Sequence, residues 1–187
     1  MKSFLQALNR PTDAFHQMNV KLSLALVAFT ILINVVFEPI LHNINGIGHT
    51  AIDIFQILRL SALGCASYLA ICIILWAVCK CFGSKATLGT YLKTWGITYF
   101  PTMLCSFVVA FTETFFYIFW NSMVWGMILN IIFGGILIWK TTLCVIFFHE
   151  VAGLKKVKLV GAFILVNILI LILAALSGYL GLKTPIL

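Results

Sequence analysis

The sequence predicts an all-α fold, a polytopic membrane bundle of five transmembrane helices, and three observations lead to it. The chain has 187 residues, of which 63% are hydrophobic and 9% are charged, whereas a soluble domain carries about 25% charged residues. Five apolar stretches each approach the length of about 20 residues that crosses a bilayer core. Lysine and arginine gather in every second gap between these stretches. We therefore expect residues 1–187 to form a single integral membrane domain.

The segment 1–20, which precedes the first apolar stretch, is too polar to span a membrane. Its apolar residues can share one side, and its positive residues suit a lipid surface. It is therefore expected to lie on the cytoplasmic leaflet as an interfacial segment. The apolar residues in question are Phe4, Leu5, Leu8, Phe15 and Met18.

The apolar stretches predict five spans, and polar or small residues mark some of them. Asn34 lies in the first span and Pro101 in the third. Ala62, Ala66 and Ala70 recur at every fourth position of the second, a pattern that suits close helix packing. The expected spans cover residues 22–41, 57–78, 95–119, 122–148 and 159–180.

The positive residues also predict an orientation, because cytoplasmic loops carry an excess of lysine and arginine. The segment 1–20 with Lys21, the loop 80–93 and the turn 150–158 hold most of them, while the other side holds Arg59 and Lys183. The N-terminus is thus expected in the cytoplasm and the C-terminus outside, as an odd number of spans requires. Topology accounts for the net charge of +7, so no nucleic-acid partner is expected.

Lys140 is the sharpest candidate for an intramembrane functional residue, because an ammonium in lipid is costly and often functional. It lies about 22 Å from Trp125 along a helix, in the inner third of the bilayer and within reach of water. Snorkelling of its side chain is therefore favoured over a buried cation in a pathway. Glu113 is expected near the outer border, too far away to pair with Lys140, where a solvated carboxylate is the simpler interpretation.

Metal or cofactor binding has little support in the sequence. Glu38 with His42, and His49 with Asp53, are spaced to share a helix face and bind a divalent ion on the outer side. Polar loop residues are the favoured interpretation, and no cofactor is expected. The cysteines lie in or beside spans, so a disulfide framework is not expected either.

Catalytic motifs are also missing from the sequence. There is no G-x-S-x-G and no P-loop. His149-Glu150 begins like a zinc-protease motif, but Gly153 stands where the second histidine would be required. We therefore expect no enzymatic activity.

Three segments carry a family resemblance. They are NRPTDAF at 9–15, GSKATLGTYLKTWGITYFP at 83–101 with Tyr99 and Pro101, and IWKTTLCVIFFHEVAGLKKVKLVGAFILVNIL at 138–169. Together with the five-span plan they resemble the Yip-one domain family, whose eukaryotic members are named for interaction with Ypt/Rab GTPases.

This resemblance implies a non-enzymatic integral membrane protein. The eukaryotic relatives act in vesicle trafficking and membrane organisation and carry a long cytosolic N-terminus. This chain differs there, since about 20 residues precede its first span. It looks like the short bacterial members, and a bacterial plasma membrane is the expected location.

The first functional hypothesis is a membrane scaffold or adaptor that binds anionic lipids, other membrane proteins or a second copy of itself. Its basic inner face would contribute about 1 kcal/mol per exposed lysine toward anionic lipid. This face comprises Lys80, Lys85, Lys93, Lys155, Lys156 and Lys158.

The alternative is a channel, transporter or lipid-translocating conduit for an ion, solute or lipid. The conduit would be lined by Asn34, Tyr99, Pro101, Glu113, Gly134, Gly135 and Lys140.

An intramembrane enzyme is a third hypothesis, and it requires a buried carboxylate or histidine beside a polar partner.

Overall fold

The computed structural model describes residues 11–16, 20–37, 40–41, 54–115, 119 and 122–179. All regular structure within these residues is helical, and five segments are long and apolar enough to cross a membrane. The prediction of an all-α, five-span bundle is therefore confirmed. The five segments are Val20–Phe37, Ile54–Cys81, Leu88–Thr114, Met123–Glu150 and Lys156–Leu176.

Three of the spans are regular helices, and two are interrupted. The second, fourth and fifth spans are α5 (Ile54–Cys81), α9 (Met123–Glu150) and α10 (Lys156–Tyr179). The short helix α2 (Pro11–His16) precedes the first span, in which α3 (Val20–Leu32) continues into a π-helical turn, η1 (Ile33–Phe37). The third span consists of α6 (Leu88–Thr94), a 3-10 turn η2 (Trp95–Thr98) and α7 (Tyr99–Thr114).

The third span begins earlier than the sequence predicts. Residues 88–94, expected in a basic loop, form α6 instead. Thr87 has an extended backbone before the first turn, and Lys93 lies on the exposed side of the helix. A lysine at a helix surface is compatible with the border of a span because its long stem reaches toward water. The helix that contains the third span therefore begins seven residues before the predicted span.

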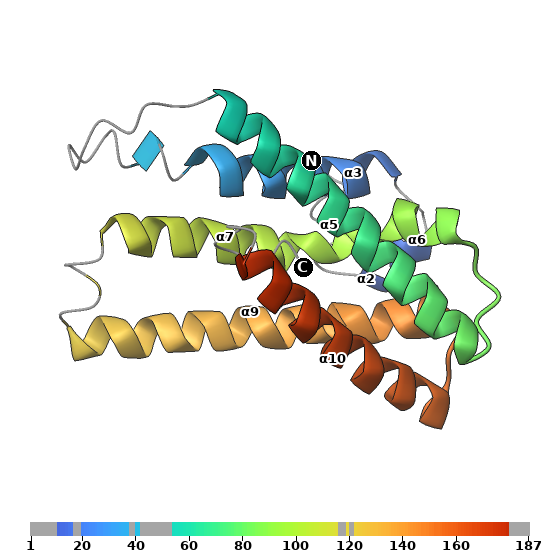
Figure 1. The fold of residues 1–187 in the computed structure, drawn as a ribbon. Helices are drawn as coiled ribbons and strands as arrows, with labels where there is room; N and C mark the ends of the chain where they lie inside the picture. Colours follow the sequence, from blue (N-terminus) through green and yellow to red (C-terminus); the bar gives the residue numbers. More distant parts are fainter. Residues whose placement is uncertain are drawn as a thin grey trace.

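The third span is the centre of the bundle, and the fifth lies at its edge. In its most apolar window 56% of the third span is buried, against 11% of the fifth. Helix α7 packs against both α3 and α9, and α10 packs against α5 and α9, as Figure 1 shows. Residues of the third span are therefore surrounded by protein on most sides.

Gly96 permits the closest approach between the first and third spans. A Cβ atom added to Gly96 would overlap the backbone carbonyl and the hydroxyl of Ser23 on α3. Only glycine leaves room for two backbones at such a separation. The contact places η2 directly against α3 and sets the depth at which the two spans pair.

Phe15 on α2 is buried in protein. It is 2% exposed, and its ring lies 5.8 Å from that of Phe147 on α9. Trp95 and Tyr91 also pack edge-on against Phe147. This part of the N-terminal segment is therefore anchored to the bundle, while residues 1–10 lie outside the described residues.

The alanine pattern of α5 does not mark a helix contact within this chain. Ala62 and Ala66 are exposed, whereas the buried side carries larger residues such as Tyr68, Ile71 and Leu75. The predicted packing of the alanine stripe is thus wrong for contacts inside the bundle.

Candidate functional site

Lys140 on α9 turns its ammonium into the bundle. Its Nζ atom donates hydrogen bonds to the carbonyl oxygen of Thr98, at 3.1 Å, and to Oγ1 of Thr102, at 2.8 Å. It also lies 4.9 Å from the ring centroid of Tyr99 and 5.5 Å from that of Trp95, a geometry that attracts a cation to the π face. The interpretation that Lys140 snorkels to water is therefore wrong, because protein groups hold the ammonium.

The backbone of the third span makes an acceptor available to Lys140. Pro101 is buried and has no N–H group. It cannot donate to the carbonyl of Ile97 or of Thr98, so this turn has fewer backbone donors than a regular helix. The carbonyl of Thr98, in the same turn, accepts a hydrogen bond from the ammonium of Lys140.

A chain of polar contacts continues from Thr102 to the first span. Ser106 Oγ donates to the carbonyl of Thr102 at 3.0 Å, and Asn34 Nδ2 donates to Ser106 Oγ at 2.9 Å. Asn34 lies in the π-helical turn η1, an irregularity frequent at functional sites. We call Lys140, Thr98, Thr102, Ser106 and Asn34 the polar seam. It crosses the bundle from α9 through the third span to η1.

The polar seam includes or adjoins four of the seven residues predicted to line a conduit. Asn34 and Lys140 are part of it, and Tyr99 and Pro101 adjoin it. Glu113 is exposed and lies about 16 Å farther along α7 than Thr102. A Cβ atom added to Gly134 or Gly135 would meet no atom, so these glycines mark no close packing.

The sequence contains an overlooked signal for the polar seam. Thr98, Thr102 and Ser106 recur at every fourth position, which places their hydroxyl groups on one helix face. Short polar side chains spaced in this way form hydrogen bonds between membrane helices.

Within the described part of the chain, two buried polar atoms near the polar seam have no hydrogen-bond partner. They are the indole Nε1 of Trp95, whose ring contacts Lys140, and Oγ of Ser23, beside Gly96. A buried donor without an acceptor costs free energy. Both atoms could bind a water molecule or a polar solute entering this region.

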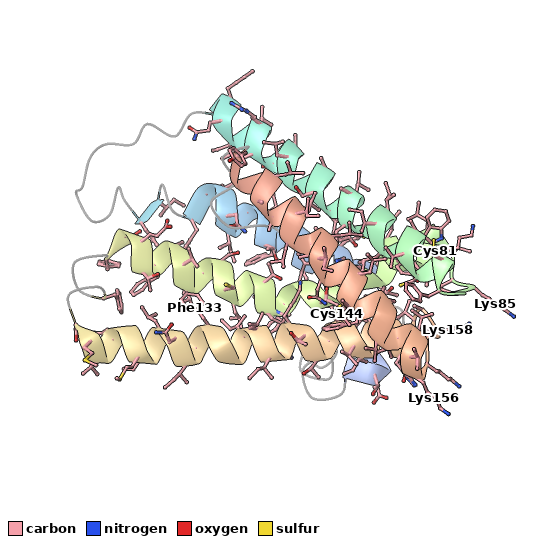
Figure 2. All side chains as sticks on the ribbon, turned by 60° about the horizontal axis from the view of Figure 1, so that its bottom comes forward. Cys81, Lys85, Phe133, Cys144, Lys156 and Lys158 are labelled. Atoms are coloured by element: carbon pink, nitrogen blue, oxygen red, sulfur yellow. The ribbon has the colours of Figure 1, made fainter. Side chains whose placement is uncertain are left out.

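The six lysines of the basic face are all exposed. They come from the end of α5, the loop 82–87, α6, the turn before α10 and the start of α10, and Figure 2 shows Lys85, Lys156 and Lys158 at one end of the bundle. Lys80 packs over the Trp76 ring at 4.6 Å. Among the described residues no ion pair involves these lysines, and Glu150 is paired with His149 at 2.9 Å.

Two tight turns shape this basic end. Gly83 and Gly153 have φ angles of +94° and +69°, which glycine adopts at little cost. Between them lies a shallow cleft of about 440 Å³ whose walls include Lys155, Lys156 and Lys158. The turns thus bring lysines from the start of α10 beside the loop that follows α5.

The remaining candidate residues contribute no further site. The expected metal ligands Glu38, His42, His49 and Asp53 lie outside the described residues. All six cysteines are free thiols. In the described ranges Glu113 and His149 are exposed, which gives the hypothesis of an intramembrane enzyme no support there.

The five apolar spans and the lysine-rich end are features of an integral, multi-pass membrane protein. A family model for the Yip1 domain matches residues 5–178, nearly the whole chain. The chain therefore belongs to the Yip1 domain family, a family of non-enzymatic membrane proteins, and the resemblance predicted from its sequence is confirmed. Comparison with curated proteins gave no match, and comparison with solved structures gave none either.

Proposed function

We propose that this chain is a non-enzymatic scaffold or adaptor of the bacterial plasma membrane, and that its basic face binds anionic lipid headgroups. One observation carries the proposal: six exposed lysines from separate segments share one end of the bundle, without ion pairs in the described part of the chain. Each lysine near an anionic surface contributes about 1 kcal/mol of attraction.

The apolar surfaces of the last two spans also support a scaffold. Only 22% of the most apolar window of α9 and 11% of that of α10 are buried. These helices offer long faces to lipid, to another membrane protein or to a second copy of this chain. Helix contacts in a bilayer depend on close packing and not on a hydrophobic driving force, so the surfaces suit reversible assembly.

Neutralising part of the basic face tests the proposal. A Lys155→Gln, Lys156→Gln, Lys158→Gln variant should lose at least about tenfold of its preference for phosphatidylglycerol over phosphatidylcholine, because three attractions of about 1 kcal/mol each are removed. Lipid retained by the purified protein can be counted by mass spectrometry of the intact complex.

The control is Arg59→Gln, which removes an exposed positive charge from the start of α5, away from the basic face. This variant should keep the preference of the wild type. Raising the salt concentration should weaken the preference of the wild type, because ions screen exposed charges. A triple variant with an unchanged preference would falsify the role of the basic face.

A second candidate function, a conduit for an ion, a small solute or a lipid, is favoured by the polar seam. Interrupted helices at membrane depth often line substrate paths, and here η1 and η2 meet the seam from two spans. The indole N–H of Trp95, which has no partner among the described residues, adds a polar group that a passing solute could bind.

Flux measurements separate this candidate from the scaffold. Under the conduit hypothesis, the protein in liposomes should carry ions or labelled lipids across the bilayer, and Lys140→Met should change the rate because it removes the cation at the α9 end of the polar seam. Lys85→Met, on the exposed loop, is the matched control and should leave the rate unchanged. Absence of flux from folded, inserted protein would exclude the conduit and leave the scaffold.

A further inference from the structure

A second cavity lies between α7 and α9, at the end of the bundle away from the basic face. Its volume is about 690 Å³, within the range of about 300–1,000 Å³ typical of small-molecule sites. Apolar side chains such as Val109, Met127 and Phe133 form much of its wall, and Figure 2 shows Phe133 between the two helices. We call this space the α7–α9 cavity.

Asn130 lines the α7–α9 cavity, where it is exposed, and its side-chain amide forms no hydrogen bond with the described residues. The other asparagines in the described spans are satisfied: Asn34 donates to Ser106 at 2.9 Å, and Asn167 donates to the carbonyl of Phe163 at 2.8 Å. An amide without a partner is costly in an apolar environment. A ligand with an acceptor at this depth would satisfy Asn130.

The polar groups of the cavity follow the order of groups in a phospholipid. Glu113 lies at the end of α7 and Ser122 at the start of α9, where a headgroup would be. Asn130 is about 12 Å farther along α9 than Ser122, and Phe133 is about 16 Å farther. The polar groups thus lie at the helix ends and farther in, with apolar side chains around them, a combination that the headgroup, ester groups and acyl chains of a glycerolipid can match.

Glu113 gives the cavity a charge preference. It is the acidic residue among the described ones that line this space. A carboxylate has about four acceptor positions, so a bond to another residue leaves capacity for a ligand. A primary amine is the complementary headgroup, because it is cationic and donates hydrogen bonds to a carboxylate.

We propose that the α7–α9 cavity binds an amine-bearing glycerophospholipid of the phosphatidylethanolamine class. The carboxylate of Glu113 accepts hydrogen bonds from the headgroup amine. The amide of Asn130 donates to an ester carbonyl, and the apolar atoms of the lipid contact Val109, Met127 and Phe133. This site is independent of the basic face, which attracts anionic lipids at the other end of the bundle.

Two glycines of α9 provide a matched test of the cavity. A Cβ atom at Gly126 or at Gly134 would meet no atom, so both positions accept a larger side chain, but only Gly126 lines the cavity. Gly126→Leu should lower retention of phosphatidylethanolamine by the purified full chain about tenfold, while Gly134→Leu should retain it as the wild type does. Equal retention by the two variants would overturn the proposal.

The headgroup preference is tested by comparing phosphatidylethanolamine with phosphatidylcholine of identical acyl chains, since a trimethylated amine cannot donate a hydrogen bond. The wild type should prefer phosphatidylethanolamine, and Glu113→Gln should reduce that preference about tenfold, the effect of losing one charge-assisted hydrogen bond. Glu150→Gln, at the opposite end of α9, is the control.

Equal retention of the two lipids by the wild type, or an unchanged preference in Glu113→Gln, contradicts the assignment. Asn130→Ala provides a second variant that should weaken retention of both lipids. Helical content and thermal unfolding measured on every variant show that folded proteins are being compared.

Discussion

Lys140 is solvated by protein groups within a segment long enough to span the membrane. A lysine at the centre of a membrane helix costs about 3 kcal/mol on insertion scales. Its hydrogen bonds to Thr98 and Thr102 contribute about 1.5–3 kcal/mol each as bonds to a charged group, and the rings of Tyr99 and Trp95 add cation–π attraction. These contacts are large enough to offset the cost without a carboxylate partner.

The close contact between Gly96 and Ser23 leaves no room for a larger side chain at position 96. Gly96→Ala should destabilise the protein by about 1–3 kcal/mol, because the new methyl group overlaps the Ser23 backbone and forces the two spans apart. Gly135→Ala is the matched control, since its methyl group meets no atom and alanine favours a helix by about 0.5–1 kcal/mol. Thermal unfolding in detergent, followed by helical circular dichroism, should give a lower midpoint for Gly96→Ala alone. A midpoint equal to that of Gly135→Ala would contradict the tight contact.

At the residue scale, the sequence singles out unusual residues but does not predict their environment. Lys140, Asn34 and Pro101 stand out because polar residues and proline are unusual in apolar stretches. The direction of the Lys140 side chain could not be predicted, because it depends on acceptors that Thr98 and Thr102 bring to α9 from 42 and 38 residues away.

At the scale of the element, the bounds of the third span also depend on residues that are distant in the sequence. Hydropathy predicts its apolar part well but places its start at residue 95, because Lys93 ends the apolar run. The helix instead begins at Leu88, and the η2 turn that follows α6 packs against α3 through Gly96. Both features arise from contacts with other spans, which a scan along one segment does not contain.

The face of α5 that packs inward also differs from the one that the sequence suggested. The alanine residues suggested its packing face, yet the structure buries Tyr68, Ile71 and Leu75. Tyr68 has a partner for its hydroxyl group, which donates to the carbonyl of Leu92 at 2.7 Å, and its ring packs edge-on against Tyr99 at 5.5 Å. A large side chain that is satisfied in this way gives more contact area than a small one, so the aromatic face is the one that packs inward.

At the scale of the whole molecule, the class of fold and the number of spans follow from composition and apolar length alone. Those two properties depend on the bilayer, which requires a helix of about 20 apolar residues for each crossing. The polar seam and the α7–α9 cavity depend on which spans are neighbours. The charge pattern predicts neither neighbour nor cavity, but it predicts which end of the bundle faces the cytoplasm.

The orientation of the bundle is therefore the whole-molecule prediction that the proposed scaffold depends on most. A membrane-impermeant thiol reagent should label a Lys85→Cys variant in inside-out vesicles and not in intact cells, because lysine-rich loops stay in the cytoplasm. Asn45→Cys, in the loop expected outside, should show the opposite pattern, with the exposed Cys65 and Cys81 replaced by serine in both variants. Labelling of Lys85→Cys from outside the cell would show that the orientation is the reverse of the predicted one. The six lysines would then face away from the anionic cytoplasmic leaflet, and the basic face could not anchor a scaffold to it.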